Sequence, residues 1–361
     1  MIKGLVLMYA SHTDKTDIHT IRQSKMSHKV LGFLTLLAFA PQVNAASPEV
    51  NVYSYRQPFL IKPITTAFTK KTGIKVNVLY AKQGIAEKLE REGKYSPADM
   101  VLTSDFNRLL EITQKGLTQA NHDDQLIQAI PKQYRANDGH WFALTTRARA
   151  LYVSKSRVEA NDQITYEDLA TGLFKGRICI RSGKHPYNIS LIASMIAHHG
   201  EQQTKIWLTG LKDNLARKPQ GNDRGQVKAI KEGVCDIAFG NSYYYGKMLQ
   251  NEEQKQWADA VNIVFPNQND RGVHINISGM ALAKYAPNKQ NAEKLMAFLS
   301  DEEAQSMYSA LNMEYPVNPA VEPSEMVKSW GEFKSDTLPL SEMVKHRKTA
   351  YKLLDEVKFD L

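Results

Sequence analysis

A repeated alternation of strand-like and helix-like segments, beginning near residue 50, constrains the fold of this chain more than any other feature. Three segments have the alternating apolar pattern of strands, at residues 50–55, 74–81 and 98–104. Each is followed by a helix-like segment, at residues 62–73, 85–93 and 106–116. Gly73 and Gly116 stand at the ends of two of these helices, where left-handed caps favour glycine. Strand–helix–strand repetition favours a parallel sheet covered by helices.

A second set of α/β segments begins near residue 147. Strand patterns recur at residues 176–182 and 234–240, and helix patterns at residues 190–200, 201–211 and 225–233. A strand-like segment at 272–284 and a helix at 288–300 indicate a return to the first set. We therefore predict an α/β fold with two lobes and a ligand cleft at their junction. The predicted parts are residues 46–148 plus 272–310 for lobe 1, 149–271 for lobe 2, and 311–361 for a C-terminal helical segment packed on the lobes.

The N-terminus has the layout of a secretory signal peptide. A basic stretch precedes an apolar run at residues 30–40, and a small-x-small cleavage pattern follows, ending at Ala45. The apolar run is too short to span a bilayer. We expect translation to start at Met26 and cleavage to follow Ala45, so that residues 1–45 are absent from the exported protein. A short buried helix is the alternative.

Cys179 and Cys235 are the two cysteines of the chain, and both lie in the portion expected to be exported. An even pair in an oxidising compartment most simply forms a disulfide. Each cysteine lies in one of the strand-like segments that precede the tyrosines considered below, so a bridge would tie these two segments together. Two buried free thiols are the alternative.

Charge and motifs argue against several functions. Residues 1–45 hold five Lys/Arg against two Asp/Glu, which leaves +5 of the formal +8 charge on the other 316 residues. The basic residues are scattered, so nucleic-acid binding is not indicated. No C-x₂-C or H-E-x-x-H motif occurs, and His198 and His199 would point about 100° apart on a helix, which disfavours shared metal ligation. No serine nucleophile elbow, paired catalytic carboxylates or Cys–His pair supports an enzyme.

Tyr243 and Tyr244 closely follow the strand-like run at residues 234–240, with Tyr245 beside them. This is the carboxyl end of a strand, where a cleft is expected. A phenol has a pKa of about 10, so it becomes an anionic ligand only where a hard, highly charged cation such as Fe³⁺ displaces its proton. On residue types alone, adjacent tyrosines at a strand end are more often core or rim aromatics, and both interpretations stay open.

Longer stretches of the sequence resemble the periplasmic ferric-iron-binding proteins of ABC transporters. The stretches that carry the resemblance are "IRSGKHPYNISLIASMIAHHG", "LARKPQGNDRGQVKAIKEGVCDIAFGNSYY" and "FPNQNDRGVHINISGMALAKYAPN". It extends upstream through "TGIKVNV", "EGKYSPADMVLT" and "TTRARALYVSK", and so covers the exported chain as far as "EYPVNP". The resemblance implies a type II periplasmic binding protein, in which two lobes, each a mixed sheet covered by helices, are joined by hinge strands.

In that family three tyrosines of the second lobe coordinate the ferric ion. One follows an "IRS"-type strand and a consecutive pair follows a "CDIA"-type strand, so the matching positions here are Tyr187, Tyr243 and Tyr244. Tyr187 lies at the start of a predicted helix, whose positive end favours a phenolate. Tyr245 is expected to point elsewhere, by alternation along a strand, and to be structural.

The first lobe departs from the family pattern. Many relatives carry a His-Tyr pair after an arginine as further ligands, but here Gln57 and Pro58 follow Arg56, and neither is a good ferric ligand. Tyr55 is the nearby candidate for a further metal ligand, although neighbours in a strand face opposite sides. Otherwise carbonate, another anion or water completes the shell. Arg56, Gln57 and Arg149 are the candidates for holding that anion or supporting the ligands.

The resemblance thus implies a monomeric periplasmic binding protein, not an enzyme, that captures Fe³⁺ and delivers it to an inner-membrane permease driven by an ATPase. Phenolates of one lobe bind first, and closure about the hinge completes the shell. Because the ligands must lose protons, affinity should fall as the pH falls. A protein of the same fold that binds an anion or a small organic solute is the alternative. A secreted enzyme that uses a tyrosine or arginine as acid or base is a third, less favoured class.

Overall fold

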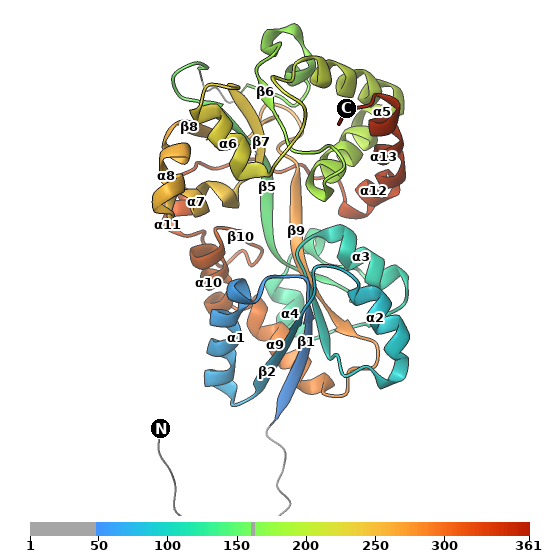
Figure 1. Cartoon of the computed structure of the whole chain (residues 1–361). Helices are drawn as coiled ribbons and strands as arrows, with labels where there is room; N and C mark the ends of the chain where they lie inside the picture. Colours follow the sequence, from blue (N-terminus) through green and yellow to red (C-terminus); the bar gives the residue numbers. More distant parts are fainter. Residues whose placement is uncertain (1–47, 160–162) are drawn as a thin grey trace, which may run out of the picture. The chain divides into compact units, whose positions relative to one another are not determined.

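The computed structural model describes residues 48–159 and 163–361. The predicted start at Met26 and the predicted cleavage site after Ala45 lie outside these residues. The described chain is a mixed α/β fold, with helices on both sides of the strands (Figure 1). Within it, no helix is long and apolar enough to cross a membrane.

The first part of the fold has the strand–helix alternation that the sequence predicts. Its elements are β1 (Glu49–Ser54), α1 (Pro58–Thr72), β2 (Lys75–Tyr80), α2 (Ile85–Glu92), β3 (Met100–Thr103), α3 (Phe106–Gln114), β4 (Thr118–Gln119) and α4 (Asp124–Ala129). Short 3-10 turns occupy Gly93–Tyr95 and Lys132–Tyr134. β1 pairs in parallel with both β2 and β3. Gly73 caps α1 in the left-handed conformation (φ 72°), as expected.

Two long strands, β5 (Phe142–Ser154) and β9 (Ile275–Ala283), make the sheet mixed instead of parallel. β9 pairs antiparallel with β3 on one side and with β5 on the other. β5 pairs with β9 along its first half, and with β7 and β8 along its second half. The strand order is therefore β2-β1-β3-β9-β5-β7-β6, with β5 shared between the two groups of strands.

The second group of elements carries the predicted tyrosines. It comprises β6 (Ile178–Cys179), α5 (Pro186–Asp213), α6 (Asp223–Lys231), β7 (Ile237–Asn241), α7 (Tyr243–Leu249), α8 (Glu252–Asp259) and β8 (Val261–Val264), with 3-10 turns at Asp168–Ala170 and Gly172–Phe174. β6 and β7 are parallel. The two helices expected on either side of Gly200 form one element, α5, that is kinked at this glycine (φ 77°, ψ 169°). Left-handed φ favours glycine, which accounts for the residue at the kink.

The remaining helices cover the two groups of strands. They are α9 (Lys289–Ser300), α10 (Glu302–Asn312), α11 (Glu325–Lys328), α12 (Leu340–Lys345) and α13 (Arg347–Glu356), with the short strand β10 (Tyr315–Pro316) paired to β5. α12 and α13 pack against α5, whereas α9 and α10 pack against α1 (Figure 1).

Two large apolar clusters fill the interior, one in each of the two groups of strands. One contains Val52, Phe68 and Met280 and lies among β1, β3, β9 and their helices. The other contains Ile178 and Phe239 and lies among β5, β6, β7 and α5. Burial of these side chains is the main source of stability for both parts.

Candidate functional site

The structure brings together the three tyrosines that the sequence singles out. Tyr187 comes from the first turn of α5, and Tyr243 and Tyr244 begin α7. The hydroxyl oxygens of Tyr187 and Tyr243 are 3.1 Å apart. The rings of Tyr243 and Tyr244 have centroids 4.3 Å apart. Phenols 56 residues apart in the chain thus share one site.

The local sequence explains how Tyr187 is placed. Pro186 occupies the first position of α5, where its missing N–H costs nothing. His185 is the N-cap, and its Nδ1 accepts a hydrogen bond of 3.3 Å from the Tyr187 N–H. The phenol therefore lies near the positive end of the helical segment that runs from Pro186 to the kink at Gly200, where negative charge is favoured.

The tyrosines after β7 are helical, so the expected alternation along a strand is wrong. Successive side chains on a helix differ in direction by about 100°. Tyr245 accordingly leaves the group and packs its ring against those of Tyr152 and Trp330, with centroids 6.3 and 5.9 Å away.

Burial makes two phenols of this site, those of Tyr243 and Tyr244, harder to ionise. It raises the pKa of Tyr243 well above its usual value, and the neighbouring Tyr187 and Tyr244 add to the effect. Burial likewise raises the pKa of Tyr244 to about 12. Arginine cations nevertheless lie close to the rings. The guanidinium carbons of Arg149 and Arg181 are 5.9 and 5.5 Å from the Tyr187 ring centroid.

A buried polar network lies behind the tyrosines, and the sequence interpretation missed most of it. Arg149 Nη1 donates to Asp223 at 2.6 Å and to the Asn241 side chain at 3.0 Å. Its Nη2 donates to the Asn188 side chain at 2.7 Å. A signal was present in the sequence, because Asn188 directly follows Tyr187 and Asn241 precedes Tyr243 by two positions.

Asn222 and Asp223 lie at the start of α6. Asn222 caps this helix, accepting a 3.0 Å hydrogen bond from the Gly225 N–H. The carboxylate of Asp223 is fully buried and forms ion pairs with Arg149 and Arg181.

The candidates from the first part of the chain do not contact the tyrosines through any hydrogen bond among the described residues. Tyr55 is buried, and its hydroxyl accepts a 3.1 Å hydrogen bond from the Ile85 N–H at the start of α2. Arg56 is also buried, and its Nη2 forms an ion pair with Glu314 at 3.0 Å. Gln57 is exposed at the start of α1. Their roles as metal ligand or anion holder stay predictions.

The cysteines form a disulfide, which confirms the predicted bridge. Cys179 ends β6 and Cys235 precedes β7, so the bridge joins the two parallel strands that lead to the tyrosines.

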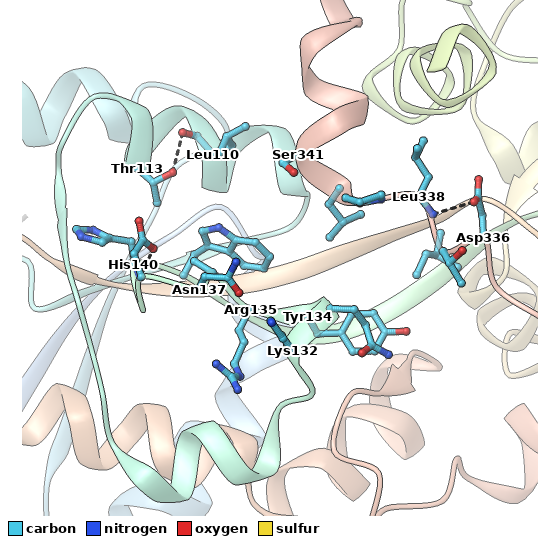
Figure 2. Close-up of a pocket in the computed structure, with 18 of the residues that line it drawn as sticks. Leu110, Thr113, Lys132, Tyr134, Arg135, Asn137, His140, Asp336, Leu338 and Ser341 are labelled. Atoms are coloured by element: carbon cyan, nitrogen blue, oxygen red, sulfur yellow. Dashed lines mark hydrogen bonds between the residues drawn. The ribbon is translucent and has the colours of Figure 1, made fainter. Parts of the chain in front are cut away.

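Two cavities lie on opposite faces of β9. A small one of about 10 Å³, the space of about one water, is lined by Tyr187, Arg149 and Asn276 among others. A larger one of about 1040 Å³ is lined by Ile275. Ile275 directly precedes Asn276, and the side chains of successive strand residues face opposite sides of the sheet. Figure 2 shows Thr113, Tyr134 and Leu338 around this larger cavity, and no predicted site residue lines it. Nor do the described residues contain a group of three His, Cys, Asp or Glu side chains suited to a metal.

This fold, with partly buried phenols beside the strand shared by its two parts, defines a two-lobed binding protein of the type II periplasmic class. In structure the chain is similar to apo ferric ion-binding protein A of Pasteurella haemolytica, with a TM-score of 0.83 and 54% identity over 87% of this chain and 99% of that one. It is also similar to the Trichodesmium protein IdiA or FutA in complex with iron and citrate, with a TM-score of 0.82 and 39% identity over 86% and 99% of the two chains.

The sequence comparisons agree with the structural ones. The chain is 40% identical over 311 residues to iron uptake protein A1 of Synechocystis, covering 85% of this chain and 86% of the relative. Residues 64–335 match the bacterial extracellular solute-binding protein family, and the chain belongs to that family. The predicted fold class and resemblance are thus confirmed. The expectation that the chain is not an enzyme is confirmed too, since this family consists of solute-binding proteins.

Proposed function

We propose that this chain is the periplasmic solute-binding component of a ferric iron ABC transporter, with Tyr187, Tyr243 and Tyr244 as phenolate ligands. The observation that carries the proposal is the convergence of these phenols, with two hydroxyl oxygens 3.1 Å apart, in a chain whose relatives are named for iron uptake and ferric ion binding. Two oxygens at that distance can bind one cation from adjacent positions of its coordination shell.

The chemistry of the phenols suits a hard trivalent cation. Because burial raises the pKa values of Tyr243 and Tyr244, only a strong Lewis acid displaces their protons. Each phenolate bound means a proton released, so affinity falls as the pH falls. Arg149 and Arg181, close to Tyr187, offset part of the negative charge that three phenolates bring.

Other groups complete the coordination shell. Arg56 is committed to Glu314 and Tyr55 to the start of α2, so each must give up a contact before it can serve the metal. We therefore favour water or an anion such as carbonate for the remaining positions. The candidates to support it are Gln57, exposed before α1, and Arg149, which lines the small cavity with Tyr187 but already donates to Asp223, Asn188 and Asn241.

The transport cycle follows from the two-lobed fold. Lobe 1 comprises residues 46–148 and 272–310 and lobe 2 residues 149–271, a division supported by the two apolar clusters. Residues 311–361 pack on both lobes. The protein, exported after cleavage at Ala45, acts as a monomer in the periplasm, closes over iron and docks on a membrane permease driven by an ATPase.

A visible titration with ferric citrate tests the proposal. Residues 46–361 should develop a phenolate-to-iron absorption band that saturates near one equivalent and bleaches in acid. Tyr187→Phe, Tyr243→Phe and Tyr244→Phe should each weaken or remove the band. Tyr245→Phe is the matched control and should leave it unchanged, because Tyr245 packs against Trp330. A colourless titration would overturn the proposal and direct the search to anions and small organic solutes.

A further inference from the structure

Asp223 is a fully buried carboxylate with three strong donors around it. Its Oδ2 accepts from Arg149 Nη1 at 2.6 Å and from the backbone N–H of Asn241 at 3.0 Å. Its Oδ1 accepts from Arg181 Nη1 at 3.1 Å. Its side chain has no solvent exposure, so all of these bonds are made in a low-dielectric interior where they are strong.

Arg149 connects Asp223 to the residues next to the tyrosines. Its planar fork holds Asp223, the Asn241 side chain and the Asn188 side chain at once. Asn188 is the neighbour of Tyr187 at the start of α5, and Asn241 ends β7 just before Tyr243. One guanidinium therefore ties together the two elements that present the phenols.

The same carboxylate also offsets the charge of the two arginines that flank Tyr187. Arg149 and Arg181 both pair with Asp223 while their guanidinium carbons lie within 6 Å of the Tyr187 ring centroid. Without Asp223, two buried or half-buried cations would lie side by side, and such unpaired charges are costly. Both side chains would then be free to move away from the ring.

We infer that Asp223 is a positioning residue of the tyrosine site, which acts through Arg149 and Asn241 to fix the distance between Tyr187 and Tyr243. This inference rests on the proposed function for its link to iron. The geometric part of the inference is the fixed contact between the two phenols. It concerns the metal-free protein and can be tested independently of iron binding.

The test compares Asp223→Asn with Asp236→Asn. Asp236 is a matched control, because it also pairs with two arginines, Arg157 and Arg177, but lies before β7, at the end away from the tyrosines. We expect Asp223→Asn to weaken ferric binding by about 10- to 100-fold, the usual effect of removing a partner of metal ligands. We also expect it to shift the maximum of the visible band, whereas Asp236→Asn should leave both unchanged.

Arg149→Lys is the second variant and separates geometry from charge. Lysine keeps the positive charge but cannot hold three acceptors in a fixed fork. If Asp223 acts by positioning, Arg149→Lys should resemble Asp223→Asn in affinity and band position. If Arg149→Lys retains wild-type binding and band, charge alone suffices and the inference is wrong.

Metal-free protein with labelled tyrosine distinguishes failure of this inference from failure of the proposed function. The nuclear Overhauser contact between the Tyr187 and Tyr243 rings should be present in wild type and Asp236→Asn, and lost in Asp223→Asn. A contact that survives in Asp223→Asn would overturn the inference whether or not iron binds. A wild-type protein that binds no iron would overturn only the proposed function.

Discussion

At the scale of single residues, burial decides which groups can change their charge. The phenols of Tyr243 and Tyr244 and the imidazole of His274 are all held neutral by the interior, but with different consequences. A cation can reverse the effect on the phenols by displacing their protons. The imidazole of His274 forms a 3.1 Å hydrogen bond with the Ser190 hydroxyl, and its burial should affect the pH dependence of stability.

His274 should make the protein less stable in acid. Burial lowers its pKa to about 3, despite the opposing charge of Asp336 and with the support of the Arg149 and Arg271 cations. In the unfolded chain a histidine binds its proton near pH 6.5. Between about pH 6.5 and 3 the unfolded state therefore holds more protons, and the free energy of unfolding falls by up to about 1.4 kcal/mol per pH unit.

Urea denaturation at pH 7 and pH 4.5 measures this effect. Between these pH values His274→Gln should lose about 2.5 kcal/mol less stability than the wild type. His122→Gln, at an exposed position, is the control and should behave as the wild type does. Equal losses for His274→Gln and the wild type would show that His274 does not titrate as described.

The sequence could supply the three tyrosines but not the residues that position them. Tyr187, Tyr243 and Tyr244 were found through resemblance, since on residue types alone they are ordinary aromatics. Asp223 was not among the predicted site residues, because its pairing with Arg149 depends on residues 74 positions apart that no local pattern connects. Long-range pairs of this kind follow from strand order, which a single sequence does not give.

At the scale of elements, local sequence signals predicted the ends of helices better than the lengths of strands. Gly73 and Gly200 mark a helix cap and a kink because left-handed φ favours glycine at both. The strand expected at residues 176–182 shrinks to Ile178–Cys179, however, because only these residues pair with β7. The disulfide compensates at this short pairing by joining Cys179 directly to Cys235.

Removing the disulfide should lower stability substantially. The bridge closes a loop between residues 56 positions apart, which in the chain-entropy description contributes about 4 kcal/mol. Chemical denaturation of the wild type with and without reductant measures the loss. The double variant Cys179→Ala with Cys235→Ala should match the reduced wild type and not respond to reductant. A wild type whose stability ignores reductant would contradict the prediction.

At the scale of the whole molecule, the strand order shows how the two groups of strands are joined. β5 pairs with β9 through its first half and with β7 and β8 through its second half. The alternation of segments predicted an α/β fold, and resemblance predicted its two-lobed class. The insertion of β9 between β3 and β5 could not be predicted locally, because β9 comes from more than 100 residues later in the chain.

Iron should close the lobes. Small-angle X-ray scattering of residues 46–361 should show a smaller radius of gyration with ferric iron than without, because closure brings further ligands to the phenolates. The triple variant Tyr187→Phe, Tyr243→Phe and Tyr244→Phe should show no change on adding iron. A wild type that binds iron at an unchanged radius of gyration would contradict closure.

Resonance Raman spectroscopy of the ferric-loaded protein, excited within its visible band, tests the central claim most directly. If Tyr187, Tyr243 and Tyr244 bind iron as phenolates, the spectrum should show enhanced tyrosinate ring modes that shift when the tyrosines are ring-deuterated. These modes should weaken in Tyr187→Phe and stay unchanged in Tyr245→Phe. A ferric complex whose spectrum contains no tyrosinate modes would contradict the claim.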